Sequence, residues 1–149
     1  MRSCARLTGL LVFVCIMVWM VPACGEKQQG RVVVSEEEFV VRQDTDHSWV
    51  IDARGKVKNV GDMDVKNVVV TGYCKSCGEV LVNGRWFVSD YAKTPGQKDT
   101  INYLPVGAEK SFSFRGVAFL VDQSGRQPQQ IPEKMVVEVI SFEKAGSSS

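Results

Sequence analysis

The sequence predicts an all-β fold, an antiparallel β-sandwich of about seven strands. Short runs rich in β-branched and aromatic residues recur at close spacing, and several alternate apolar with polar residues. The loops between them are rich in Gly and Pro, and no long segment has the 3.6-residue period of a helix. A closed β-barrel is the architectural alternative that the pattern leaves open.

Charge composition argues against a nucleic-acid-binding function. The chain of 149 residues has 18 basic and 17 acidic residues, and neither sign forms a long run. Binding to nucleic acid needs a concentrated basic face that displaces counterions from phosphates. We therefore expect no nucleic-acid partner.

The first 23 residues have the pattern of an export signal and lie outside the predicted domain. Arg2 and Arg6 give a positively charged start, and residues 10–21 form an unbroken apolar run. This run is shorter than the roughly 20 apolar residues that a membrane-spanning helix needs. Val21-Pro22-Ala23-Cys24 then resembles the lipobox of bacterial lipoproteins, in which the cysteine is acylated and becomes the new N-terminus. The alternative is an ordinary secretory signal cleaved near Ala23, which leaves Cys24 as a free thiol.

The lipobox resemblance implies a membrane anchor made of lipid on Cys24, because two or more acyl chains hold a protein stably at a bilayer. Gly25 in place of an aspartate resembles the pattern of outer-membrane sorting in enteric-type bacteria. We expect a protein of the cell membrane or outer membrane that faces the periplasm or the exterior. Residues 24–38 are mostly polar and are predicted to be a flexible tether with a reach of about 35 Å.

The globular domain is predicted to span residues 39–144, and its first strands are the clearest. Residues 49–58 alternate, with Trp49, Ile51, Ala53 and Val57 on one face, which is typical of a half-buried antiparallel strand. Residues 59–62 have turn chemistry. Residues 65–73 are rich in valine, as expected of a central strand.

The second half of the domain is predicted to hold one hairpin and two further strands. Asn83-Gly84 between residues 79–82 and 85–88 indicates a hairpin, and residues 89–102 indicate a loop that crosses between sheets. After a turn at residues 103–107, Phe112 and Phe114 face inward on a strand that bends at Gly116. A polar loop covers residues 122–134, and a last strand covers 135–142. Residues 145–149 are predicted to be a disordered tail. The size of the domain suits one immunoglobulin-like sandwich.

Three stretches of the domain resemble the FxLYD domain, an immunoglobulin-like module of bacterial lipoproteins and exported proteins. They are residues 55–62 (GKVKNVGD), residues 65–70 (VKNVVV) and residues 106–114, in which a VGAE turn precedes Phe112-Ser113-Phe114. Residues 70–74 (VTGYC) occupy the place of the family's signature and share its tyrosine. The resemblance implies a non-catalytic domain with no general ligand.

Cys74 and Cys77 form the one motif with chemical content. A β-turn brings residues i and i+3 within about 7 Å, which permits a disulfide, and an exported compartment is oxidising. The alternative is an envelope thiol protein that uses this pair for redox exchange or metal binding. A redox pair normally begins a helix, whereas residues 79–82 indicate a strand. A zinc site needs four ligands, which two cysteines alone do not supply. Covalent attachment of haem needs a histidine directly after the second cysteine, where this chain has Gly78.

The remaining candidate residues indicate binding rather than catalysis. His47 is the only histidine and is predicted to lie solvated in a polar loop. Trp86 and Tyr91 are predicted to pack near the hairpin, although exposed aromatic residues at a loop end can also contact a partner. We expect no enzyme activity and no cofactor. The expected function is a lipid-anchored interaction or scaffold domain that binds another envelope protein, and carbohydrate binding through Trp86 and Tyr91 is a weaker alternative.

Overall fold

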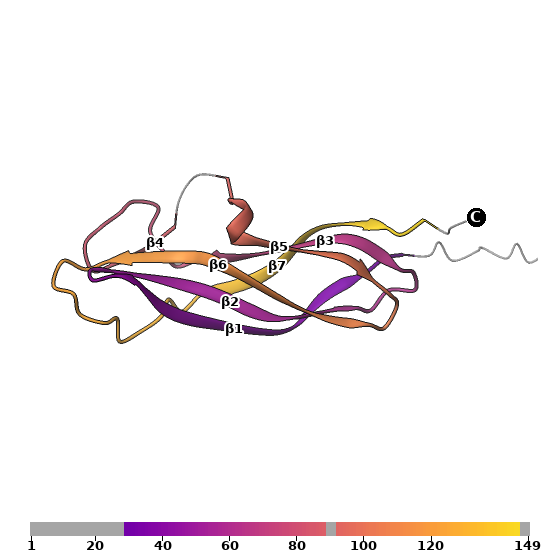
Figure 1. The fold of residues 1–149 in the computed structure, drawn as a ribbon, viewed down its shortest axis with the longest axis horizontal. Helices are drawn as coiled ribbons and strands as arrows, with labels where there is room; N and C mark the ends of the chain where they lie inside the picture. Colours follow the sequence, from indigo (N-terminus) through magenta and orange to yellow (C-terminus); the bar gives the residue numbers. More distant parts are fainter. Residues whose placement is uncertain (1–28, 89–91, 147–149) are drawn as a thin grey trace, which may run out of the picture.

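The computed structural model describes residues 29–88 and 92–146, which form two antiparallel β-sheets packed face to face (Figure 1). One sheet has the strand order β1-β2-β6-β4 and the other has the order β5-β3-β7. The predicted all-β sandwich is therefore confirmed. Residues 1–23, Cys24 and Tyr91 lie outside the described residues. The strands are β1 Val32–Thr45, β2 Ser48–Asn59, β3 Val65–Cys74, β4 Trp86–Phe87, β5 Lys98–Leu104, β6 Glu109–Val121 and β7 Met135–Lys144, and a 3-10 turn, η1, covers Pro95–Gln97.

The distribution of strands between the sheets differs in one respect from that of a constant-type immunoglobulin domain. In that domain the first, second, fourth and fifth strands share a sheet. Here β1, β2 and β4 share a sheet with β6, and β5 lies in the other sheet beside β3. The fifth and sixth strands have thus exchanged sheets, and the connection between them passes from one layer to the other.

The core lies between β2 and β6 on one side and β3 on the other. Trp49, Ile51, Ala53 and Val57 are all buried, as the alternation in β2 predicts. In β3, which lies between β5 and β7, Val65, Val68 and Val70 are fully buried. The sequence therefore predicts this central strand correctly.

β6 supplies the aromatic part of the core. Phe112 and Phe114 are both buried and stack with ring centroids 5.6 Å apart, as predicted from their inward alternation. Gly116 has φ 76°, a left-handed conformation that favours glycine, and β6 continues beyond it to Val121. The predicted bend within one continuous strand is confirmed.

The prediction of a flexible tether through Glu38 is wrong, because β1 begins at Val32. β1 pairs with β2 along its length, and this places the glutamates of the Ser35–Glu38 segment in an extended strand. Glu36 lies 3.0 Å from Lys56 and Glu38 lies 2.7 Å from Arg54, both in exposed ion pairs. The polar residues that indicated a linker are instead exposed residues of an edge strand.

Two predictions in the middle of the chain are also wrong. Residues 79–85 form a loop, and β4 pairs with β6 rather than with residues 79–82, so there is no Asn83-Gly84 hairpin. The predicted loop over residues 89–102 contains β5, which begins at Lys98. The sequence gives little indication of this strand, since among its seven residues Ile101 and Leu104 alone are buried.

Candidate functional site

A disulfide closes the corner where β3 ends. Cys74 and Cys77 are bridged, with their Cα atoms 5.5 Å apart, as the sequence predicts. Cys74 is 8% exposed and belongs to the core, and Cys77 packs against that core. The Lys75 N–H donates to the Lys134 carbonyl at 2.7 Å, and the Lys134 N–H donates to the Ser76 hydroxyl at 3.2 Å. The corner is therefore joined to the loop that precedes β7.

The segment that follows the corner leaves three apolar residues in solvent. Val80, Leu81 and Val82 are 71%, 56% and 46% exposed. The Arg85 N–H donates to the Val82 carbonyl at 3.1 Å, and Gly84 has φ 73°, so Asn83-Gly84 does form a turn. This turn is bonded to the end of β6, because the Gly84 N–H donates to the carbonyl of Val121 at 2.8 Å.

Trp86 connects this segment to the loop over residues 122–134. Its backbone pairs with Leu120 of β6, and its partly buried side chain packs against the core. The indole Nε1–H donates to the Gln130 carbonyl at 3.0 Å. Trp86 is therefore partly buried and connects two loops. Tyr91, the other predicted partner-binding residue, lies outside the described residues.

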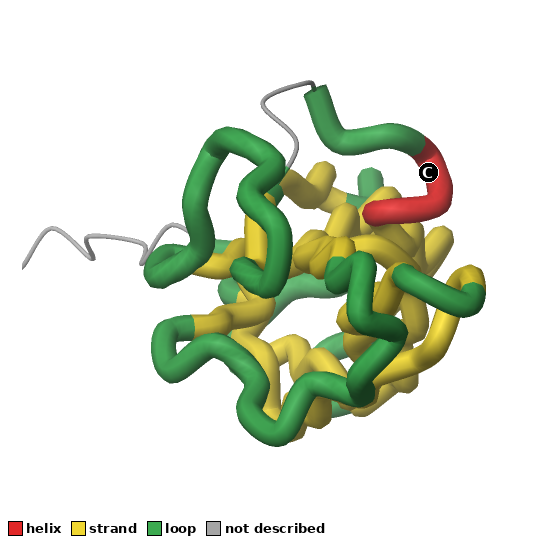
Figure 2. The backbone as a smooth tube through the Cα atoms, turned by 90° about the vertical axis from the view of Figure 1, so that its left-hand side faces the viewer, coloured by secondary structure: helices red, strands yellow, loops and turns green. Residues whose placement is uncertain are grey.

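Figure 2 shows these two loops at one end of the sandwich. Residues of both loops line an open groove of about 940 Å³, and Ile131, which is 47% exposed, lines it together with Val80. A second hollow of about 550 Å³ shares Gly84, Trp86 and Gln130 with it. We call the larger one the distal groove; its lining residues are Ser76, Cys77, Gly78, Glu79, Val80, Val82, Gly84, Arg85, Trp86, Gln130, Ile131, Pro132 and Glu133.

Charged side chains near the groove are few and of both signs. Glu79, Arg85 and Glu133 line it. In the second hollow, the hydroxyl and the backbone N–H of Ser124 bond to Asp122 and lower the pKa of that carboxyl. The groove is therefore lined by apolar and polar side chains together, with two carboxylates and one guanidinium among the lining residues.

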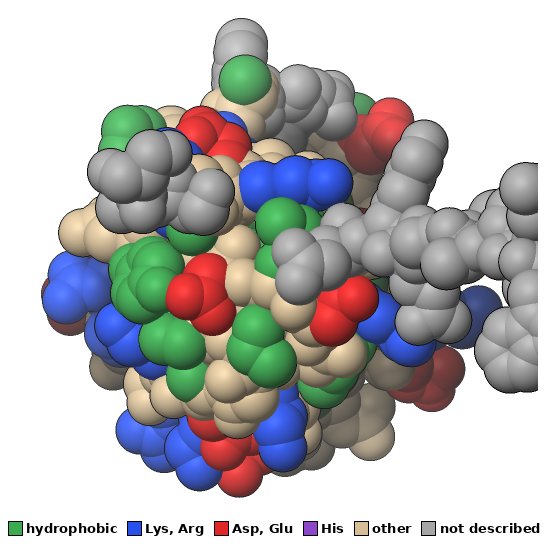
Figure 3. Space-filling model, turned by 90° about the vertical axis from the view of Figure 1, so that its right-hand side faces the viewer, with side chains coloured by type: hydrophobic (Ala, Val, Ile, Leu, Met, Phe, Trp, Pro, Cys, Tyr) green, Lys and Arg blue, Asp and Glu red, His purple; other side chains and the backbone are tan. Residues whose placement is uncertain are grey.

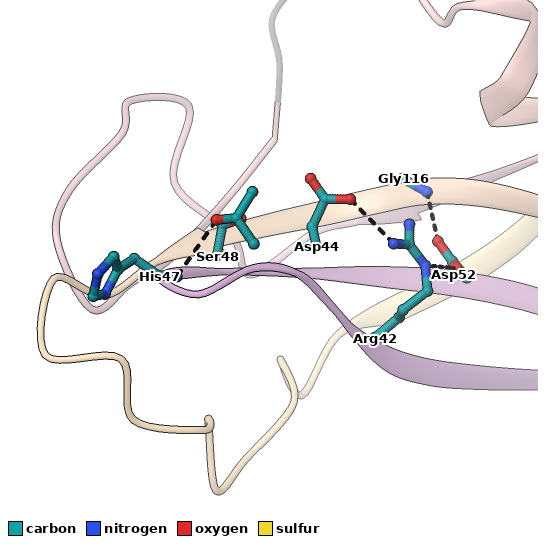
Figure 4. A network of polar contacts seen from close by, with 7 residues as sticks. Arg42, Asp44, His47, Ser48, Asp52 and Gly116 are labelled. Carbon is teal, nitrogen blue, oxygen red and sulfur yellow. Dashed lines mark hydrogen bonds and ion pairs between the residues drawn. The ribbon is translucent and has the colours of Figure 1, made fainter.

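His47 lies in the exposed turn between β1 and β2, as predicted. Figure 4 shows its ring turned away from a nearby group in which Arg42 bonds to Asp52 and Asp44, at 2.9 and 3.1 Å. Hydrogen bonds to these two carboxylates raise the pKa of Arg42, the Asp52 bond most. The second oxygen of Asp52 accepts the Gly116 N–H at 3.1 Å, so the group fixes the bend in β6.

The described part of the chain contains no cluster of three or more His, Cys, Asp or Glu side chains arranged to hold a metal ion. Across residues 29–88 and 92–146, no helix has the length and apolar character to cross a membrane. No protein-family model, curated protein or solved structure matches the chain.

The sequence reasoning singled out Trp86 and the cysteine pair but missed the other wall of the groove. The segment Asp122–Lys134 has the composition of a polar loop, and its exposed isoleucine, Ile131, is the local signal for the second wall. Residues 79–82 are predicted to be one strand of a hairpin, and Val80–Val82 are exposed because this segment pairs with no strand.

Proposed function

We propose that the protein is a lipid-anchored, non-catalytic interaction domain of the cell envelope that binds another envelope protein through the distal groove. The observation that carries the proposal is the exposure of Val80, Val82 and Ile131 in one groove that Trp86 also lines. Single exposed apolar residues are common on soluble proteins, whereas a contiguous group that flanks a groove is typical of an interaction site.

The position of the groove suits a protein held by its N-terminus. The described chain begins and ends at one end of the sandwich, and the loops that form the groove lie at the other (Figure 1). The two ends are about 40 Å apart, because β2 alone has 12 residues that each rise about 3.3 Å. An anchor on Cys24 would therefore present the groove away from the membrane.

The lining indicates the chemistry of the partner. Its walls offer Val80, Val82 and Ile131, while Glu79 and Glu133 outnumber Arg85 among the charged lining residues. An extended partner segment with an apolar centre and a basic flank fits this surface best. Binding of such a segment of another envelope protein is also compatible with a scaffold role. The resemblance to FxLYD domains stays a prediction.

Site-specific photocrosslinking in intact cells tests the proposal. We expect a photoreactive residue at Val80, which lines the groove, to crosslink one envelope protein, and the same residue at exposed Thr100 on β5 to give no such product. Ile131→Asp should abolish the Val80 product, because it places a charge in the groove. Palmitate labelling that is lost in Cys24→Ser tests the anchor in the same cells. Equal products from both positions, or none, would contradict the binding site.

A further inference from the structure

The first described residues are fastened to the turn between β2 and β3. Asp62 accepts the Gln29 N–H on its side chain at 2.6 Å and donates its own N–H to the Gln29 carbonyl at 3.2 Å. The Arg31 carbonyl accepts the N–H groups of Val60 and Gly61, at 2.8 and 3.1 Å. A Cβ on Gly61 would lie only 2.4 Å from the Gln29 carbonyl oxygen, so the two segments are in close contact.

This attachment limits how far the domain can stand from its anchor, given the acylation of Cys24 that is part of the proposed function. Five residue steps separate Cys24 from Gln29 and span at most about 18 Å when fully extended. The predicted reach of about 35 Å, which counted residues through Glu38 as tether, is therefore too long. The turn at Val60–Asp62 must stay close to the lipid headgroups.

The end of the sandwich that faces the anchor has the composition of a membrane-contacting surface. Val60, Val106 and Phe142 are 42%, 48% and 37% exposed. Figure 3 shows hydrophobic side chains over the middle of this end, with Asp and Glu side chains between them and Lys and Arg side chains around them. We call these three residues, together with the exposed cations Arg31, Lys58 and Lys110, the anchor face.

The carboxylates at this end are held within the domain. Asp62 binds the Gln29 N–H, Glu109 binds the Ser35 hydroxyl at 2.6 Å, and Glu143 lies 3.7 Å from Lys66. Asp64 accepts the Val106 N–H and the Tyr103 hydroxyl, and these bonds lower the pKa of Asp64 and raise the pKa of Tyr103. These carboxylates keep their charge but are oriented by partners within the domain, whereas the cations Arg31, Lys58 and Lys110 are exposed to solvent.

We propose that the anchor face rests on the phospholipid headgroups, with Val60 and Val106 in the interface and the cations beside anionic lipid. Each contact is weak on its own. The short link to the acylated cysteine keeps the face at high effective concentration near the bilayer, so weak contacts suffice to orient the domain. The sandwich then stands on the membrane with the distal groove pointing away.

Fluorescence of the acylated protein in vesicles of phosphatidylethanolamine and phosphatidylglycerol tests this orientation. After acylation of Cys24 the mature chain's other cysteines form the bridge, so an introduced thiol is the only one to label. A polarity-sensitive dye at Val106→Cys should shift to the blue and be quenched by nitroxide headgroups. The same dye at Leu81→Cys, in the distal groove segment, should show neither effect.

Charge reversal supplies the second readout. Lys58→Glu changes the charge by two units, so it should lower the ratio of lipid-quenched to unquenched protein at position 106 about 25-fold in anionic vesicles and little in phosphatidylcholine vesicles. Lys134→Glu, on the loop that lines the groove, is the matched control and should change nothing. Flotation with vesicles, together with the mass of the N-terminal peptide, reports acylation separately.

The outcomes separate the two proposals. Acylated protein that floats while the dye at 106 stays in water would overturn the orientation and leave the anchor standing. Protection at 106 without lipid quenching would indicate a protein contact and would also overturn it. Protein without acyl chains would overturn both the anchor and the orientation.

Discussion

Asn59 is the residue whose removal should weaken the domain most for its size. It is fully buried at the end of β2, where its Nδ2 donates to the carbonyls of Met63 and Leu104, at 2.9 and 3.1 Å. Its Oδ1 accepts the Gly61 N–H at 3.0 Å. We expect Asn59→Ala to lower the free energy of unfolding by about 3 kcal/mol, because the Met63 and Leu104 carbonyls lose this donor and the Gly61 N–H, which also donates to the Arg31 carbonyl, loses one of its two acceptors. Chemical denaturation of the purified domain measures this loss.

Asn102→Ala provides the comparison, since Asn102 is exposed on β5 and its replacement should change stability by less than about 0.5 kcal/mol. Equal effects of the two substitutions would show that the buried amide is dispensable. The sequence identifies Asn59 as a turn residue but gives no sign of its burial. That burial depends on Leu104, 45 residues away, which local propensity cannot report.

The disulfide stiffens the end of one strand and leaves the rest of the fold independent of it. A bridge that closes so short a loop should stabilise the domain by about 2 kcal/mol. We expect the Cys74→Ala/Cys77→Ala variant to lose about that much while it keeps its β-sheet circular dichroism. Because Cys74 is 8% exposed and Cys77 lines the distal groove, a reductant can reach the bridge only at Cys77, and resistance to glutathione-strength reductant would support the structural role. An easily reduced bridge with a reactive Cys77 thiolate would instead support the thiol-protein alternative.

The strands predicted correctly are those whose own side-chain pattern is enough to indicate a strand. β2, β3 and β6 each have apolar residues buried on one or both faces, and β7, although it is an edge strand with Val137 alone buried, has the apolar run MVVEVISF. β1 and β5 are edge strands with polar sequences and few buried residues, so they resemble linker and loop. Residues 79–82 give the opposite error. They have high β propensity, but the neighbouring strand position is taken by β4 paired with β6, and tertiary structure overrides propensity.

The distal groove could be predicted only in part, for a related reason. Its base follows from Trp86 and the cysteine pair, which the sequence marks by residue type. Its second wall comes from a loop that is distant along the chain, with Gln130 lying 44 residues after Trp86, and long-range hydrogen bonds such as those from Trp86 to Gln130 and from Lys75 to Lys134 bring the two together. The pairing of loops across a sandwich is set by sheet order, which the sequence pattern did not supply.

The molecule as a whole is closed along both open sides of the sandwich by a carboxylate that reaches from one sheet to the other. Glu37 of β1 accepts the Val137 N–H of β7 at 2.8 Å. On the other side, Asp99 of β5 accepts the Ser113 N–H of β6 at 2.8 Å. Each carboxylate occupies a strand-edge donor that another chain could otherwise bind, and inward-pointing charges of this kind protect sheet edges from aggregation.

We call these two inter-sheet hydrogen bonds the seams, and they should contribute independently to the stability of one cooperatively folding domain. We expect Glu37→Ala and Asp99→Ala each to lower the free energy of unfolding by about 1–2 kcal/mol, since each leaves an edge N–H without its charged acceptor. In the double variant the losses should add to within about 0.5 kcal/mol, because the seams share no partner, and fluorescence and circular dichroism should follow a single transition. The double variant should also aggregate at lower protein concentration than wild type, as light scattering would report.

Glu36→Ala is the matched control, because Glu36 adjoins Glu37 in the same acidic run but forms only an exposed ion pair with Lys56. Such pairs contribute about 0–1 kcal/mol, so this variant should remain close to wild type in both stability and solubility. If Glu36→Ala and Glu37→Ala behave alike, the acidic run acts through charge alone and the seam bond has no separate role. If the double variant unfolds in two steps, each sheet is its own cooperative unit. The core that β2, β3 and β6 share argues for one step, since neither sheet can expose its inner face without exposing the other.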